Sequence, residues 1–166
     1  MRIQDQSSRI LLARKVATLD ASGTTASVVL FTVTGSVLVH GIWGVVTGAT
    51  DLTNHTKGHL RTNDQTATID LTEAVTGIAL SGLAVGTLVS KTALAAVALT
   101  LDDNAAAKIT EPASAGQGLL SPFIVVKKTA AVTSIDYRYT TTDAPADAEI
   151  TFGALWEPLS TDGNLV

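Results

Sequence analysis

The stretch from residue 24 to residue 50, TTASVVLFTVTGSVLVHGIWGVVTGAT, contains no Asp, Glu, Lys or Arg. It is long enough to cross a bilayer as one helix, so its composition has to decide between a membrane span and a soluble core. Val, Thr, Ile and Phe favour a pleated strand, and each of the four glycines would weaken a helix interior by about 1 kcal/mol relative to Ala. We therefore expect buried strands here and no membrane-spanning segment.

Two strands, over residues 25–33 and 36–47, account for this stretch. Between them lies Thr34-Gly35-Ser36, where Gly35 can adopt a positive φ at no steric cost. We expect a tight turn at this glycine that folds the two strands into a hairpin at the centre of the core.

Apolar and polar residues alternate over residues 134–140, which predicts a strand with one dry and one wet face. Its dry face would carry Ile135, Tyr137 and Tyr139, and its wet face Asp136, Arg138 and Thr140. Residues 149–159 alternate in the same way, and Pro158 should end that strand. Its inward side chains would be Ile150, Phe152, Ala154 and Trp156.

The remaining segments give weaker signals. Residues 51–65 are polar and rich in turn formers, so we assign them mostly to a surface connection, with room for a short strand over 57–62. Residues 93–101 favour a helix by their alanines and a strand by their alternation, and both interpretations stay open. Other short strands are expected over residues 16–19, 66–71, 86–91 and 123–128.

These elements predict an all-β protein, an antiparallel β-sandwich or barrel of jelly-roll-like type. A chain of 166 residues fits one domain and can bury a sizeable core without metals or disulfides. We place that domain at residues 16–166 and interpret residues 1–15 as a flexible N-terminal arm, either frayed or docked on a neighbouring subunit.

Charge is distributed unevenly along the chain. Residues 1–15 carry a net charge of +3, from four basic residues against Asp5, while the remainder carries −7. The basic residues of the arm are Arg2, Arg9, Arg14 and Lys15. An acidic body repels nucleic acid, so we expect no nucleic-acid partner. The apolar run from Ile10 to Ala13 is too short for an export signal, which indicates synthesis in the cytoplasm.

His55 and His59 have the spacing that places two imidazoles on one side of a helix, where they could bind a metal ion. The segment around them reads as a loop, and no Glu that could serve as a base is adjacent. These residues are therefore only candidate metal ligands, and we expect no metal and no cofactor. His40 is interpreted as a hydrogen-bonded or partly exposed strand residue.

No catalytic motif is visible. There is no Gly-x-Ser-x-Gly elbow, no phosphate-binding loop that ends in Gly-Lys-Thr, and no Cys. A glycan hydrolase would need two convergent carboxylates, and only a cleft that brought Asp51, Asp64 and Glu73 together would supply them. We expect a protein that is not an enzyme.

Three motifs suggest a family. They are Leu30-Phe31-Thr32-Val33-Thr34-Gly35-Ser36-Val37-Leu38-Val39 with Ile42-Trp43-Gly44-Val45-Val46-Thr47, then Ala84-Val85-Gly86-Thr87-Leu88-Val89-Ser90, and finally Leu155-Trp156-Glu157-Pro158-Leu159-Ser160-Thr161-Asp162-Gly163. In this order they resemble small β-rich virion structural proteins of tailed bacteriophages. The motifs are turn and strand signals, so the resemblance transfers no functional residue.

What the resemblance implies is a capsid decoration, or cement, protein on the virion surface. Its partners would be the major capsid protein and further copies of itself, most simply as a homotrimer, after synthesis in the host cytoplasm. The alternatives are a tail, baseplate or head-fibre component, or a protein that binds the host surface. Candidate contact residues are Arg2, Arg9, Arg14 and Lys15 in the arm, and Ile78, Leu80, Leu83 and Val85 in an apolar segment over residues 78–89 that we expect to be exposed.

Overall fold

The uncharged stretch forms two long strands, β2 (Thr25–Thr34) and β3 (Ser36–Gly48), separated by Gly35 alone. This computed structural model describes residues 10–19, 25–48, 55–72, 74, 84–90, 100–102, 122–141 and 148–166. Gly35 has a φ of +56°, as the sequence predicted. The prediction of strands in place of a membrane helix is confirmed for β2 and β3. Among the described residues, no helix has the length and apolar character needed to cross a bilayer.

The expected hairpin is wrong, because β2 and β3 belong to different sheets. β2 pairs with β9 (Thr133–Thr141) and β11 (Asn164–Leu165), while β3 pairs with β10 (Glu149–Pro158). A hairpin ladder needs a loop of about two residues or more, and a single glycine is too short. Gly35 instead carries the chain from one sheet to the other, so both strands supply buried side chains to a shared core.

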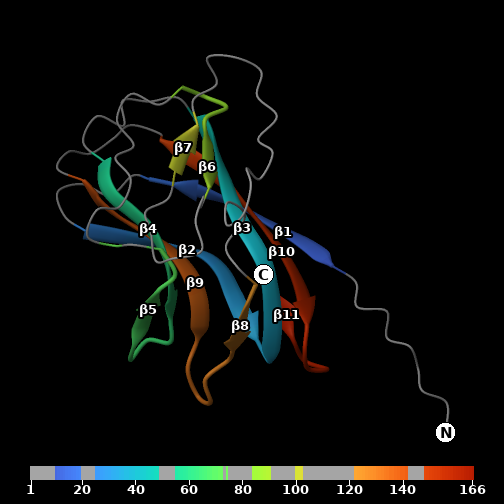
Figure 1. Ribbon diagram of the computed structural model, residues 1–166. Helices are drawn as coiled ribbons and strands as arrows, with labels where there is room; N and C mark the ends of the chain where they lie inside the picture. The colour runs from blue at the N-terminus through green and yellow to red at the C-terminus, as the bar shows by residue number, and fades with distance from the viewer. Residues whose placement is uncertain are drawn as a thin grey trace, which may run out of the picture.

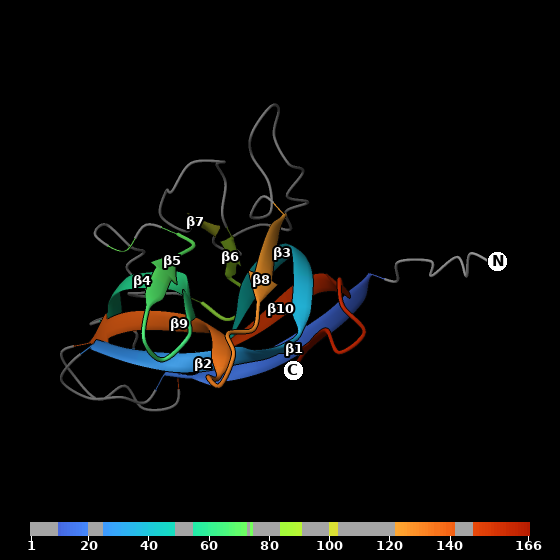
Figure 2. The same cartoon turned by 90° about the horizontal axis from the view of Figure 1, so that it is seen from below.

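Two antiparallel sheets make up the fold. Sheet A has the order β1, β10, β3, β6, β7, with β8 also paired to β3, and sheet B has the order β11, β2, β9, β4, β5. The strands not yet bounded are β1 (Leu11–Thr18), β4 (His55–Asn63), β5 (Thr68–Asp70), β6 (Leu88–Ser90), β7 (Thr100–Asp102) and β8 (Phe123–Val126). Figure 1 shows β4, β9 and β2 on the left and β3, β10 and β1 on the right, and Figure 2 gives the view from below. The architecture is a sandwich and not a closed barrel.

The core lies between the two sheets and contains the alternating residues that the sequence singled out. Ile135, Tyr137 and Tyr139 of β9 are at most 1% exposed. The inward positions of β10 are buried as well, namely Ile150, Phe152, Ala154 and Trp156. Pro158 is the last residue of β10, as expected. The period-two pattern therefore identified the dry face of both strands correctly.

The segment expected to be mostly a surface connection contains a strand inside sheet B. β4 lies between β9 and β5 and covers His55–Asn63, nine residues of a polar stretch. Leu60 reaches the core, where it is 1% exposed. The short strand allowed over residues 57–62 falls inside β4, but its full length was not predicted, because its polar side chains form partnerships with other strands and its residues do not alternate between apolar and polar.

The boundary of the N-terminal arm also needs correction. Residues 11–15, which the sequence placed in the arm, form the first part of β1. They pair in register with β10, from Leu11 opposite Trp156 to Lys15 opposite Phe152. The ladder extends this far because β10 would otherwise have an open edge beside its buried side chains.

Candidate functional site

The two candidate metal ligands, His55 and His59, lie on opposite faces of sheet B. Residues i and i+4 of a regular strand share a face, but β4 carries a bulge between Thr56 and His59. Across this bulge β4 advances by three residues while β9 advances by two. The extra residue turns the side chain of His59 to the face opposite that of His55. No group of three metal-ligating side chains occurs within the described part of the chain.

His55 belongs to the core. Its side chain stacks on Tyr139, with ring centroids 4.9 Å apart, and it is fully buried. Among the described residues, neither ring nitrogen has a hydrogen-bond partner, and the same holds for the hydroxyl of Tyr137. Burial lowers the pKa of His55 and raises the pKa of Tyr137, since both charged forms would lack solvation. Both side chains are therefore neutral packing residues.

Charged residues on the outer face of sheet B form a connected network. Arg61 Nη2 donates to Ser27 Oγ at 2.9 Å and lies 3.6 Å from Asp136 Oδ2. The carboxylate of Asp136 also accepts hydrogen bonds from Asn63 Nδ2 at 3.1 Å and from Ser134 Oγ at 2.6 Å. Asp136 is only 1% exposed, so the expectation that this face of β9 is wet is wrong at that position. Partnered charges can be buried where single ones cannot.

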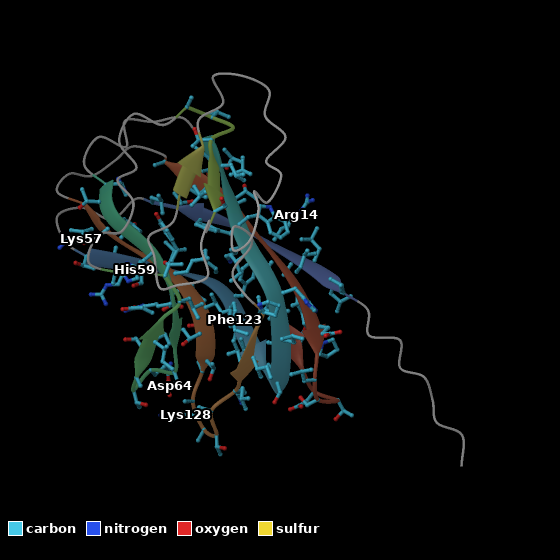
Figure 3. The ribbon with its side chains drawn as sticks, viewed as in Figure 1. Arg14, Lys57, His59, Asp64, Phe123 and Lys128 are labelled. Carbon is cyan, nitrogen blue, oxygen red and sulfur yellow. The ribbon has the colours of Figure 1, made fainter. Side chains whose placement is uncertain are left out.

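A pocket of about 280 Å³ opens beside this network. Figure 3 shows Lys57 and His59, both from β4, on this side of the molecule. Arg138 of β9 and Asp70 of β5 also line it. His59 Nδ1 lies 2.8 Å from the carbonyl oxygen of Lys57, and His59 Nε2 lies 3.6 Å from Asp70 Oδ1. The pocket is polar and carries groups of both signs.

A second candidate site lies on sheet A. β1 is an edge strand of the described sheet, and its residues 12, 14 and 16 share the outer face with Leu155 of β10. Leu12 and Val16 are 48% and 50% exposed. Trp43 of β3 lies on the same face, packed over Gly153 so closely that a Cβ there would be 2.6 Å from its ring. We call the set Leu12, Arg14, Val16, Trp43 and Leu155 the β1 surface.

A smaller groove of about 180 Å³ separates β5 from β8. Ile69 of β5 and Ile124 of β8 line it and are 69% and 62% exposed. Lys128 Nζ lies 3.1 Å from Asp64 Oδ2, and Figure 3 shows the two side chains next to each other. Hydrogen bonds from Thr66, then from Ala67, together with Lys128, hold the pKa of Asp64 well below its usual range. Asp64 therefore organises a turn.

The other candidate residues have varied placements. Arg14 and Lys15 are exposed on β1, and Val85, 44% exposed, lies in the turn before β6. His40 is partly exposed, as expected, with Nε2 3.3 Å from Glu157 Oε1. Several candidates fall outside the described residues, namely Arg2, Arg9, Asp51, Glu73, Ile78, Leu80 and Leu83.

Sequence reasoning missed the residues that complete the pocket around His59. The alternation of β9 placed Arg138 on the outer face, but nothing in the sequence indicated that it lies opposite His59. Asp70 carried no signal at all, because its position depends on the pairing of β5 with β4.

Comparison with known proteins gave no match to a protein-family model, to a curated protein or to a solved structure. Function therefore has to be inferred from the β1 surface and the pocket on sheet B.

Proposed function

We propose that the protein is a structural component of a phage virion, a decoration protein that binds the outer surface of the capsid and bridges neighbouring capsid subunits. The observation that supports this proposal is the β1 surface. It combines an open strand edge with exposed apolar side chains, and both features favour contact with another protein chain.

The composition of the β1 surface is that of an interface centre. Trp43 and Arg14 are of residue types that are enriched among binding hot spots at protein contacts, and Leu12, Val16 and Leu155 surround them with apolar area. The edge of β1, which is unpaired within the described sheet, can also accept a strand from a partner, which adds main-chain hydrogen bonds to the side-chain contacts.

Charge supports contact between copies of the same chain. Residues 1–15 carry +3 and the rest of the chain −7, so the basic start of one copy is attracted to the acidic body of the next. Such a head-to-tail contact uses two different surfaces of each subunit and closes into a ring when the rotation allows. The simplest ring that agrees with the proposed role is a homotrimer.

A decoration protein of this kind stabilises the capsid without any chemical step. Each copy that contacts two capsid subunits holds them together, and several such contacts in one oligomer act jointly through their high effective concentration. Interfaces of about 1,000 Å² or more are sufficient for specific binding.

The β1 surface can be tested with a matched pair of substitutions. Val16 and Val132 are each 50% exposed, but only Val16 belongs to the β1 surface. We expect Val16→Glu to weaken self-association by about tenfold or more in sedimentation velocity, because a charge is placed in an apolar contact, while Val132→Glu leaves it unchanged. A wild-type chain that is monomeric at high concentration, or equal effects of both substitutions, would contradict the proposed assembly.

Location is tested separately. Antibody labelling of phage particles in electron microscopy should mark the head at many regularly spaced positions. Label confined to the tail or baseplate would favour the alternative of a tail, baseplate or fibre component. Particles without label would exclude a virion role.

A further inference from the structure

The pocket on the outer face of sheet B is built around an irregularity in β4. The ladder between β4 and β9 shifts between Thr56 and His59, and Lys57 there has a φ of +57°. A residue other than glycine adopts this conformation only at an energetic cost, and such positions cluster at binding sites. The bulge places Lys57 and His59 at the same pocket.

His59 is oriented by its neighbours. It is 5% exposed, and its Nδ1 lies 2.8 Å from the carbonyl oxygen of Lys57. A carbonyl oxygen can only accept, so Nδ1 donates this hydrogen bond. In the neutral ring Nε2 is then an acceptor, and Asp70 Oδ1, 3.6 Å away, is too far for a normal hydrogen bond. Nε2 and the carboxylate of Asp70 therefore both offer acceptor capacity to a ligand.

Two cations at the pocket lack an anionic partner within the part of the chain that the structure describes. Arg61 pairs with Asp136, but neither Lys57 nor Arg138 forms an ion pair with any carboxylate of the described residues. Arg138 is half-buried and lies directly opposite His59 in the ladder, while Lys57 is exposed. A partly desolvated guanidinium without a counterion favours an anionic ligand, and its planar fork fits a carboxylate in bidentate geometry.

The rest of the lining favours hydroxyl groups. Thr25, Thr68 and Thr140 bring three hydroxyls to the pocket from three strands. Together with Asp70 and His59 they can donate to and accept from several hydroxyls on one ligand. The volume of about 280 Å³ is just below the usual range for small-molecule sites, which limits the bound part to one small ring.

We propose that this pocket binds an acidic monosaccharide unit. Its carboxylate contacts Arg138 and Lys57, and its ring hydroxyls contact Asp70, the Nε2 of His59 and the threonines. This activity goes beyond capsid decoration, and it holds whether the sugar stands alone or forms part of a surface glycan.

The proposal is tested by NMR titration of the ¹⁵N-labelled full-length protein with glucuronate, galacturonate and N-acetylneuraminate. At least one of these should give saturable shifts for amides of β4 and β9 near the pocket. Glucose lacks the carboxylate, and acetate lacks the ring hydroxyls. Each should bind with an affinity that is lower by about tenfold or more, since each lacks one group of partners.

Variants assign the two halves of the ligand to residues. Arg138→Gln should weaken binding of the acidic sugar about tenfold or more. Asp70→Asn should weaken binding of the sugar hydroxyls but not weaken acetate binding, because the substitution removes a negative charge from the pocket. Lys127→Gln, which removes an exposed cation outside the pocket, should change neither and serves as the matched control. Amide spectra of each variant establish that it is folded.

Three results would overturn the proposal. They are the absence of saturable shifts with all three acidic sugars, equal binding of acetate or inorganic phosphate, and equal loss in Lys127→Gln and Arg138→Gln. Because the β1 surface is not involved, each of these results leaves the test of self-association by Val16→Glu unaffected.

Discussion

His55 is held in the core by the aromatic ring beside it and not by hydrogen bonds. Its stacking on Tyr139 supplies apolar contact area, while neither of its nitrogens has a hydrogen-bond partner in the ranges that the structure describes. A buried polar group in this situation costs about 1–3 kcal/mol. The buried ring nitrogens of His55 therefore oppose folding, while the packing of its ring against Tyr139 favours folding.

We expect stability to depend on pH through this residue. Burial lowers the pKa of folded His55 below 6.5, so at lower pH the unfolded chain binds a proton that the folded chain does not. The free energy of unfolding should then fall as the pH drops from about 6.5 toward the lowered pKa. His55→Phe keeps an aromatic ring at this position and removes the proton site. Measured by urea unfolding, its free energy of unfolding should exceed that of wild type by more at pH 5 than at pH 8.

His55→Ala is the control for packing. It should lose the same pH dependence but be less stable than His55→Phe at both pH values, because the stacked ring is gone. An equal gain for His55→Phe at both pH values would assign the pH dependence to other groups.

At the scale of single residues, the sequence predicted which apolar side chains are buried and failed for polar ones. Tyr137 and Phe152 followed from alternation alone. Asp136 was assigned to solvent although it is buried, because its burial depends on Arg61 and Asn63, which lie about seventy positions earlier in the chain. A pairing over that distance leaves no local pattern.

Among the elements, the corner at Gly35 connects the two sheets. The turn that follows β10 packs against it, with Ser160 Oγ accepting from the backbone N–H of Ser36 at 2.8 Å. A Cβ on Gly35 would lie 2.4 Å from Asp162 Oδ1 and 2.7 Å from the backbone nitrogen of Gly163. Space and φ both require glycine.

Substitutions can separate these two requirements. Asn tolerates positive φ better than Ala, but both add a Cβ. We expect Gly35→Asn and Gly35→Ala each to lower the free energy of unfolding by about 2 kcal/mol or more in chemical denaturation, with Ala the worse of the two. If Gly35→Asn were as stable as wild type, the close approach of the C-terminal turn would not be the limiting factor.

Strand positions were predictable because they depend on local composition and turn chemistry. The partners of each strand were not, because the long ladders of β2 with β9 and of β3 with β10 join residues about a hundred or more positions apart. The same limit applies to the pocket on sheet B, whose lining comes from β2, β4, β5 and β9. The spacing of His59 to His55 suggested a shared metal ion, whereas in the structure His59 lies beside Asp70 and Arg138.

For the whole molecule, two deletions distinguish the N-terminal residues that belong to the folded domain from those that are free to contact other proteins. Removing residues 2–15 deletes Leu11–Lys15 of β1 and exposes the edge of β10. We expect this deletion to cost about 2 kcal/mol or more, as each ladder hydrogen bond contributes about 0.5–1.5 kcal/mol. Removing residues 2–9 leaves β1 complete and should keep the melting temperature within a few degrees of wild type by calorimetry.

The shorter deletion is therefore the one that tests the arm. If Arg2 and Arg9 contribute to docking, the chain without residues 2–9 should remain folded and occupy capsids less. Full occupancy of capsids by this variant would exclude Arg2 and Arg9 from docking. A loss of stability as large as that of the longer deletion would show that residues 2–9 belong to the folded domain.

The pairing of β2 has a consequence for synthesis on the ribosome. Both of its neighbours in sheet B, β9 and β11, come from residues 133–165, which are translated well after β2 itself. A nascent chain that has emerged only as far as Ala131 therefore carries β2 with neither of its described ladder partners. Nascent polypeptides in this state depend on rapid completion or on chaperones to avoid aggregation.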